Sequence, residues 1–267
     1  MLNALSQRFS LAVLTGIIAW MLPAMLFASD LDREKRLADQ IVDAIFDGDP
    51  LFLNADGHDF LSIYMEAAEP SSRAVLLVHG RGYHPDWENV TQPLRVGLTE
   101  HGWNTLSIQV PVLDKEAKFY DYLPIMPEVL PRIDAALAYL EEQGNKEVVL
   151  LAHSCGVHMA MAWVRANGSE AIDGFVGVGM GATDYKQPMP EPFPFERLQV
   201  PVLDLYGALD YPAVLHGAEG RWQAIQKYGG PASRQVMLDD GDHYMREQDA
   251  VLVDTVANWL NSSIGQR

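Results

Sequence analysis

The chain has 267 residues, enough for one large domain with a buried core, and 48% of them are hydrophobic. Its 36 acidic and 19 basic residues give a formal charge of −17. This balance argues against nucleic acid as a partner, because phosphate binding needs clustered Lys and Arg. The single cysteine, Cys155, excludes an internal disulfide and a zinc site built on several thiolates.

The first 28 residues differ from the rest of the chain. Arg8 is the only charged residue before Asp30, and an apolar run extends from Leu11 to Ala28. Such a segment is typical of an export signal, so we expect a periplasmic or secreted protein. The run is also long enough for an uncleaved anchor, which would hold the protein at the inner membrane through residues 11–28. Both interpretations of residues 1–28 stay open, and residues 29–267 are expected to form a single domain.

Strand-like and helix-like segments then follow in chain order. Residues 30–46 predict an amphipathic helix, and an Asp-Gly step joins two strand-like runs, 51–55 and 60–66, into a hairpin. Short apolar runs then alternate with helical patterns. The predicted strands are 74–78, 105–110, 148–152, 174–178, 202–206 and 235–238. The predicted helices are 87–101, 127–143, 155–166, 214–228 and 246–261.

This alternation predicts an α/β fold. The central sheet would be mostly parallel, with about eight strands, an N-terminal hairpin and helices on both faces. Two long segments, 111–126 and 184–199, fit neither pattern and are expected to be loops. The second contains four prolines, which exclude a regular helix there.

The sharpest motif lies at the end of the predicted strand 148–152. The strand runs into Ala-His-Ser-Cys-Gly, and a helical pattern begins at once, which is the context of a nucleophile elbow. The tight turn needs small residues two before and two after the serine, here Ala152 and Gly156. The common form has Gly at both positions, so Ala152 departs from it by one methyl group. The motif predicts Ser154 as a nucleophile; the competing interpretation is a serine that caps a helix.

A second motif follows the predicted strand 74–78, which ends in His-Gly-Arg-Gly. A loop of this kind supplies a backbone N–H to an oxyanion hole. We therefore expect the backbone N–H groups of Arg81 and of Cys155, the residue after the nucleophile, to be the two donors. His79 is expected to hold the loop by hydrogen bonds instead of acting as a base.

The remaining candidates follow two later strands. Asp210 lies in a Gly-x-x-Asp sequence after the strand 202–206, and His243 lies in a turn after the strand 235–238. Carboxyl ends of parallel strands meet at one edge of the sheet, where open α/β folds place their sites. Asp184, which follows the strand 174–178, stays open as the alternative acid.

From about Leu51 to Ala257 the chain resembles the α/β-hydrolase superfamily, specifically exported bacterial serine esterases or lipases, which share the order Ser, acid, His. The resemblance implies that Ser154 attacks a carbonyl carbon, His243 transfers its proton and Asp210 orients the imidazole. We hypothesise a small acyl ester or thioester as substrate. The sequence shows no convincing phosphate loop, haem signature or dinucleotide fingerprint, so we expect no cofactor. Phe119–Met126, Phe193 and Phe195 are hypothesised to line an apolar acyl pocket. The alternative is an exported binding or scaffold protein that keeps the fold without catalysis.

Overall fold

The computed structural model describes residues 28–264. The segment interpreted as an export signal or anchor therefore lies outside the described residues, except for Ala28. Within the described part, no helix is both long and apolar enough to span a membrane.

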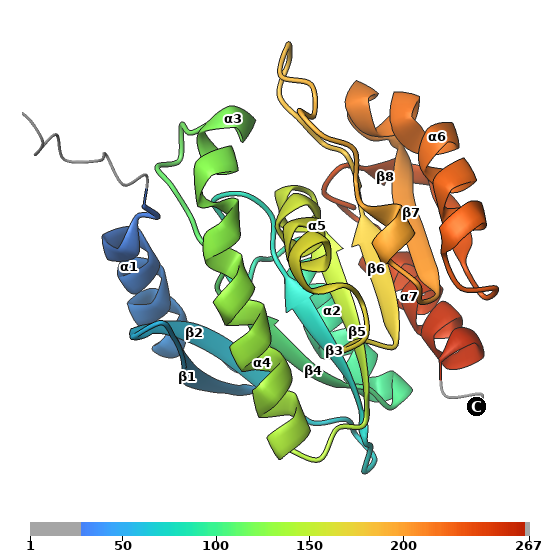
Figure 1. Ribbon diagram of the computed structural model, residues 1–267. Helices are drawn as coiled ribbons and strands as arrows, with labels where there is room; N and C mark the ends of the chain where they lie inside the picture. The colour runs from blue at the N-terminus through green and yellow to red at the C-terminus, as the bar shows by residue number, and fades with distance from the viewer. Residues whose placement is uncertain (1–27, 265–267) are drawn as a thin grey trace, which may run out of the picture.

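The centre of the molecule is a sheet of eight strands in the order β1-β2-β4-β3-β5-β6-β7-β8 (Figure 1). The β1–β2 hairpin is antiparallel, β2 is antiparallel to β4, and every other neighbouring pair is parallel. The predicted fold class is confirmed. The strands are β1 Asp49–Ala55, β2 His58–Met65, β3 Arg73–Val78, β4 Asn104–Ile108, β5 Glu147–His153, β6 Gly174–Val178, β7 Val202–Leu209 and β8 Arg234–Asp242.

Helices cover both faces of this sheet (Figure 1). The helices α4, α5 and α6 lie on one face, and α2 and α7 lie on the other. The α-helices are α1 Leu31–Val42, α2 Thr91–Gly97, α3 Phe119–Tyr122, α4 Leu130–Glu142, α5 Cys155–Asn167, α6 Pro212–Tyr228 and α7 Asp249–Ser263. Three 3-10 segments add η2 Leu98–His101, η3 Leu123–Val129 and η4 Phe195–Arg197.

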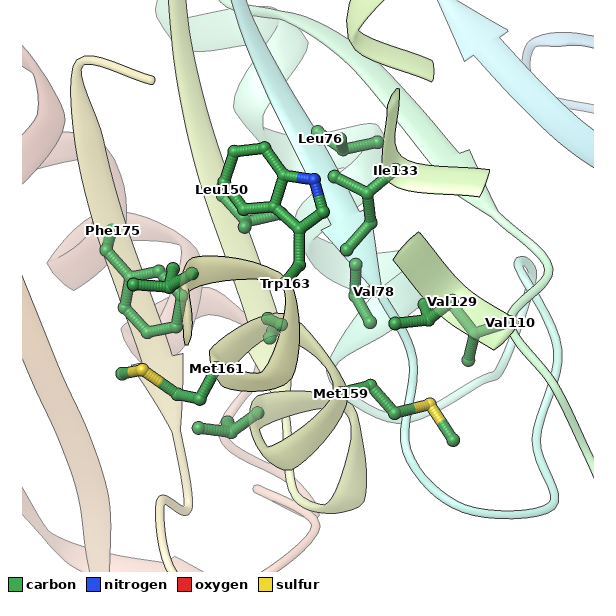
Figure 2. Packing of buried hydrophobic residues seen from close by; sticks show 14 of the residues in the cluster. Leu76, Val78, Val110, Val129, Ile133, Leu150, Met159, Met161, Trp163 and Phe175 are labelled. Atoms are coloured by element: carbon green, nitrogen blue, oxygen red, sulfur yellow. The ribbon is translucent and has the colours of Figure 1, made fainter. Parts of the chain in front are cut away.

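Alternating side chains of the central strands fill two cores. In β3, Leu76 and Val78 belong to the core under α4 and α5, whereas Val75 and Leu77 belong to the core under α2 and α7. Successive side chains of a strand point to opposite faces, so a strand that is apolar throughout fits a sheet covered on both sides. Figure 2 shows the first of these cores, in which Trp163 of α5 lies with aliphatic side chains of the strands and of α4.

Several boundaries differ from the predicted ones. The segment 111–126 is not a plain loop, because it contains α3 and the first part of η3. Helix α2 begins at Thr91, four residues after the predicted start, because Val90 has φ 64°, which is not helical. Strand β8 extends to Asp242, four residues beyond the apolar run that predicted it, because it continues to pair with β7 past an irregularity near Gly207.

Candidate active site

Ser154 lies at the sharp turn between β5 and α5. Its φ of 56° and ψ of −122° are strained for a residue with a side chain. The backbone N–H of Ser154 donates to the carbonyl of Val178 at 2.9 Å, which fixes the turn against β6. A side chain at Gly156 would collide with the carbonyl oxygens of Val78 and His79. The close approach of α5 to the end of β3 therefore requires a glycine at position 156, two residues after the serine.

The structure brings Ser154, His243 and Asp210 together in one hydrogen-bonded row. Ser154 Oγ lies 2.8 Å from His243 Nε2, and His243 Nδ1 lies 2.7 Å from Asp210 Oδ1. If the Nδ1 proton is donated to the carboxylate, Nε2 is free to accept the serine hydroxyl proton. Each of the three residues directly follows a strand: Ser154 follows β5, Asp210 follows β7 and His243 follows β8. Because these strands are parallel, the three residues meet at the carboxyl ends of the strands.

The imidazole of His243 is held by contacts that sequence reasoning did not identify. The ring of Tyr211 stacks on it, with centroids 4.2 Å apart and an interplanar angle of 23°. The backbone N–H of Tyr211 also donates to Asp210 Oδ1 at 2.6 Å. The backbone of His243 is held as well, because His153 Nε2 donates to its carbonyl oxygen at 2.9 Å. Tyr211 directly follows Asp210 in the sequence, and this adjacency is the one feature of the sequence that could have identified it as part of the site.

Tyr244, beside His243 in the sequence, completes an aromatic group with Tyr211. Their two hydroxyl oxygens are 2.7 Å apart. Burial and this hydrogen bond raise the pKa of Tyr211 well above its ordinary value, so its hydroxyl is neutral at physiological pH. The rings of Tyr211 and Tyr244 both lie against the imidazole of His243.

His79 is fully buried at the start of the loop after β3. Its Nδ1 donates to the carbonyl of Gly80 at 2.8 Å, and its Nε2 accepts from the backbone N–H of Val110 at 3.1 Å. Burial lowers the pKa of His79 to about 3, so the ring is neutral near pH 7. His79 therefore ties the loop to the chain after β4 and lies outside the row of Ser154 and His243.

The expected oxyanion donors lie beside the serine. Arg81, Ser154 and Cys155 line one cavity. Within residues 28–264, the backbone N–H groups of Arg81 and Cys155 have no protein acceptor. Burial raises the pKa of the Cys155 thiol to about 12, so this side chain is a neutral thiol near pH 7.

Asp184, the alternative acid, bonds Arg81 and Phe119, whereas the carboxylate hydrogen-bonded to His243 is that of Asp210. Its carboxylate forms a two-point ion pair with the guanidinium of Arg81, and Oδ2 also accepts the backbone N–H of Phe119 at 2.6 Å. The hydrogen bond from Arg81 lowers the pKa of Asp184 below its usual range, and the N–H of Phe119 adds to this effect. Burial alone would lower the pKa of Arg81, but the paired carboxylate outweighs it and raises that pKa. Asp184 thus joins the loop after β6 to the loop after β3 and to the start of α3.

The cavity over Ser154 has a volume of about 630 Å³ and is mainly apolar. It includes Phe119, as hypothesised for an acyl pocket, but it includes neither Phe193 nor Phe195. Phe193 lines a second cavity, and Phe195 is buried in the core. The full lining of the cavity over Ser154 is Arg81, Phe119, Ser154, Cys155, Ala182, Thr183, Asp184, Tyr185, Lys186, Gln187, Pro188, Tyr211, Pro212 and Ala213. Among the described residues, no three His, Cys, Asp or Glu side chains are grouped to hold a metal ion.

Solved structures with a similar backbone cover most of the chain. Est1E from Butyrivibrio proteoclasticus aligns over 82% of this chain and 100% of its own, with a TM-score of 0.62 and 14% identity. The Pyrococcus furiosus esterase Pf2001 aligns over 84% of this chain and 93% of its own, with a TM-score of 0.65 and 12% identity. XC6422 from Xanthomonas campestris is described as an α/β serine hydrolase without lid. It aligns over 84% of this chain and 98% of its own, with a TM-score of 0.60 and 12% identity. These likenesses show the α/β-hydrolase fold.

Comparison of the sequence with curated proteins gives no match. A family model described as "Protein of unknown function (DUF3530)" matches residues 28–122 and 123–262, which together are most of the chain. The protein therefore belongs to the DUF3530 family and has the α/β-hydrolase fold.

Proposed function

We propose that the protein is a serine hydrolase that cleaves an ester or thioester through an acyl-enzyme on Ser154. The observation that carries the proposal is the row of hydrogen bonds from Ser154 Oγ through His243 to Asp210. A serine hydroxyl is a weak nucleophile unless a base takes its proton, and this row supplies such a base. The esterases among the similar structures are consistent with this chemistry.

In the first half of the reaction, Ser154 Oγ attacks the carbonyl carbon while its proton passes to His243 Nε2. The carbonyl oxygen becomes an oxyanion, and the backbone N–H groups of Arg81 and Cys155 are its proposed donors. The intermediate then breaks its bond to the leaving alcohol or thiol, which receives the proton from His243. The acyl group remains esterified to Ser154.

In the second half, water replaces the alcohol. His243 Nε2 takes a proton from the water as its oxygen attacks the acyl carbon, and the proton returns to Ser154 Oγ as the carboxylic acid leaves. Asp210 keeps its hydrogen bond to His243 Nδ1 and stabilises the imidazolium that forms twice in each cycle. Tyr211 holds both partners, because its ring stacks on His243 and its N–H binds Asp210.

A fluorophosphonate probe, which reacts with activated serines, tests the proposal directly. We expect strong labelling of the purified wild-type protein and complete loss of labelling in Ser154→Ala, because the nucleophilic oxygen is gone. Ser72→Ala is the matched control. Ser72 is exposed and lies at the amino end of β3, whereas Ser154 lies at the carboxyl end of β5. Intact mass of the adduct and peptide mapping give the labelled residue.

The result also separates the two candidate classes of function. Labelling of folded Ser154→Ala at the wild-type level would place the reactive serine elsewhere and end the proposal. No labelling of folded wild-type protein would favour the binding or scaffold alternative.

A further inference from the structure

A second cavity, of about 400 Å³, adjoins the cavity over Ser154, because the two share a lining residue. Residues of η3, of α5 and of the chain that follows Pro188 line this partly open cavity, and three of them are Met126, Met161 and Met189. Methionine side chains are flexible and apolar, so such a lining adapts to an alkyl chain of varying shape. Nothing in the proposed chemistry at Ser154 uses this second cavity.

Phe119 is the one residue that lines both cavities. Its side chain is only 2% exposed, and its ring centroid lies 4.7 Å from that of His158, which lines the second cavity. The chain crosses between the cavities at two consecutive residues, with Pro188 lining the first and Met189 the second. The partition is therefore thin, and an aromatic ring forms part of it.

The backbone of Phe119 is fixed from the side of the proposed oxyanion loop. Its N–H donates to Asp184, whose carboxylate pairs with Arg81. A wall anchored in this way keeps a constant position relative to Ser154. Such a wall limits the length of the group that can extend from the reacting carbon.

The chemistry decides which arm of the substrate meets this wall. His243 must give its proton to the leaving oxygen or sulfur, so the leaving group lies on the side of His243 and Tyr211. Phe119 has its contacts with His158, Tyr120 and Asp184 instead. The acyl chain is the arm that remains on this side.

We propose that Phe119 closes the acyl end of the cavity over Ser154, so that the enzyme prefers esters of short acyl chains. Shortening this side chain joins the methionine-lined cavity to the first and lets it accept a longer acyl chain. The inference rests on the proposed function, because it requires acyl transfer at Ser154.

The test measures kcat/KM for p-nitrophenyl acetate, butyrate, octanoate and dodecanoate. Wild-type activity should fall from butyrate to octanoate. In Phe119→Leu and Phe119→Ala, the octanoate-to-butyrate ratio should rise about 10-fold or more, since each added methylene that finds an apolar site gains roughly a factor of four. Phe119→Leu keeps the test valid if the more drastic change to Ala prevents folding.

Two further variants make the result specific. Ala162, on α5, lines the second cavity, so adding Ala162→Phe to Phe119→Leu should refill it and restore the wild-type ratio. Phe175→Leu is the matched control, because Phe175 is a fully buried core residue that lines neither cavity, and its ratio should not change.

The inference is overturned if folded Phe119 variants that still hydrolyse butyrate keep the wild-type ratio, or if Phe175→Leu raises the ratio equally. It is also overturned if the variants change the preference among acetate esters of different alcohols instead. A wild-type protein that neither reacts with fluorophosphonate nor hydrolyses any of these esters would instead remove the proposed function, and the inference with it.

Discussion

Asp184 shows how one side chain determines the geometry of several loops. It accepts hydrogen bonds from the Arg81 guanidinium and from the backbone N–H of Phe119. The first contact holds the loop whose N–H is a proposed oxyanion donor, and the second holds the proposed wall of the acyl pocket. Sequence reasoning offered this residue as an alternative acid, because it follows a strand in the same way as Asp210. The structure places its carboxylate on Arg81, and only the folded chain shows this pairing across 103 positions.

Replacing Asp184 by Ala should therefore slow the reaction without removing the nucleophile. We expect kcat to fall about 10-fold, less than the 100-fold or greater loss typical of a missing oxyanion donor, because the Arg81 N–H is displaced and not deleted. Fluorophosphonate labelling of Ser154 should persist at a lower rate, and Asp184→Asn should recover part of kcat. The control is Asp39→Ala, which removes an exposed ion pair with Lys35. An unchanged kcat in Asp184→Ala would show that the pair does not position the loop.

At the scale of elements, the turn between β5 and α5 explains why this part of the site was predictable. The apolar run that forms β5, the small residues around Ser154 and the helical pattern after it are all local features of the sequence. The short α3 was not predictable, because four residues carry too little periodicity and its packing on α5 and η3 decides its conformation. The extension of β8 to Asp242 was equally hidden, since polar residues continue that strand and only pairing with β7 orders them.

The close contact of α5 with the end of β3 makes a prediction for Gly156. In Gly156→Ala the added methyl group meets the backbone carbonyls of Val78 and His79, so α5 and the elbow must move. We expect the free energy of unfolding to fall by about 1–3 kcal/mol, and labelling of Ser154 to be largely lost.

The matched control for this substitution is Gly220→Ala in α6, where an added methyl group meets no atom within 4 Å. This change should stabilise the protein by about 0.5–1 kcal/mol, because Ala favours a helix interior over Gly. Urea unfolding and probe labelling measure both effects. Wild-type labelling in Gly156→Ala would contradict the argument from close approach.

At the scale of the whole molecule, two large apolar cores lie on the two faces of the sheet, a smaller apolar cluster joins α1 to β2, and buried polar groups lie among them. His79 and His153 have pKa values lowered to about 3, and His158 to about 4, in each case mainly by burial. All three are neutral in the fold near pH 7. The sequence alone does not determine their burial, because a histidine beside a glycine-rich loop or a nucleophile is compatible with a reactive role as well as with packing.

These histidines predict a loss of stability in mild acid. Below the ordinary histidine pKa of about 6.5 the unfolded chain binds protons that the fold does not, so the free energy of unfolding falls as pH falls. Three histidines together contribute a slope of about 4 kcal/mol per pH unit once they are protonated in the unfolded chain, until the pH nears their folded values. The raised pKa of buried Asp204 acts in the opposite sense, because there the fold takes up a proton.

Urea unfolding at several pH values between neutral pH and pH 5 measures this slope. His158→Gln should reduce it by about 1.4 kcal/mol per pH unit, the share of one histidine, because glutamine does not titrate. His216→Gln, which changes an exposed side chain, should leave it as in the wild type. Equal slopes in the wild type and in His158→Gln would show that burial of this ring does not oppose its protonation.

The order of strands has a consequence for how the proposed activity would be gained and lost. His243 follows β8, which is the last strand of the sheet and pairs only with β7, whereas Ser154 follows β5 near the middle. A chain emerging from synthesis therefore carries the proposed nucleophile before the proposed base, so we expect no hydrolysis until β8 pairs with β7. In the mature protein, fraying of that edge would separate the imidazole from the serine while the rest of the sheet persists. Inactivation by heat or denaturant should then precede global unfolding, which makes hydrolysis a sensitive reporter of the C-terminal edge of the molecule.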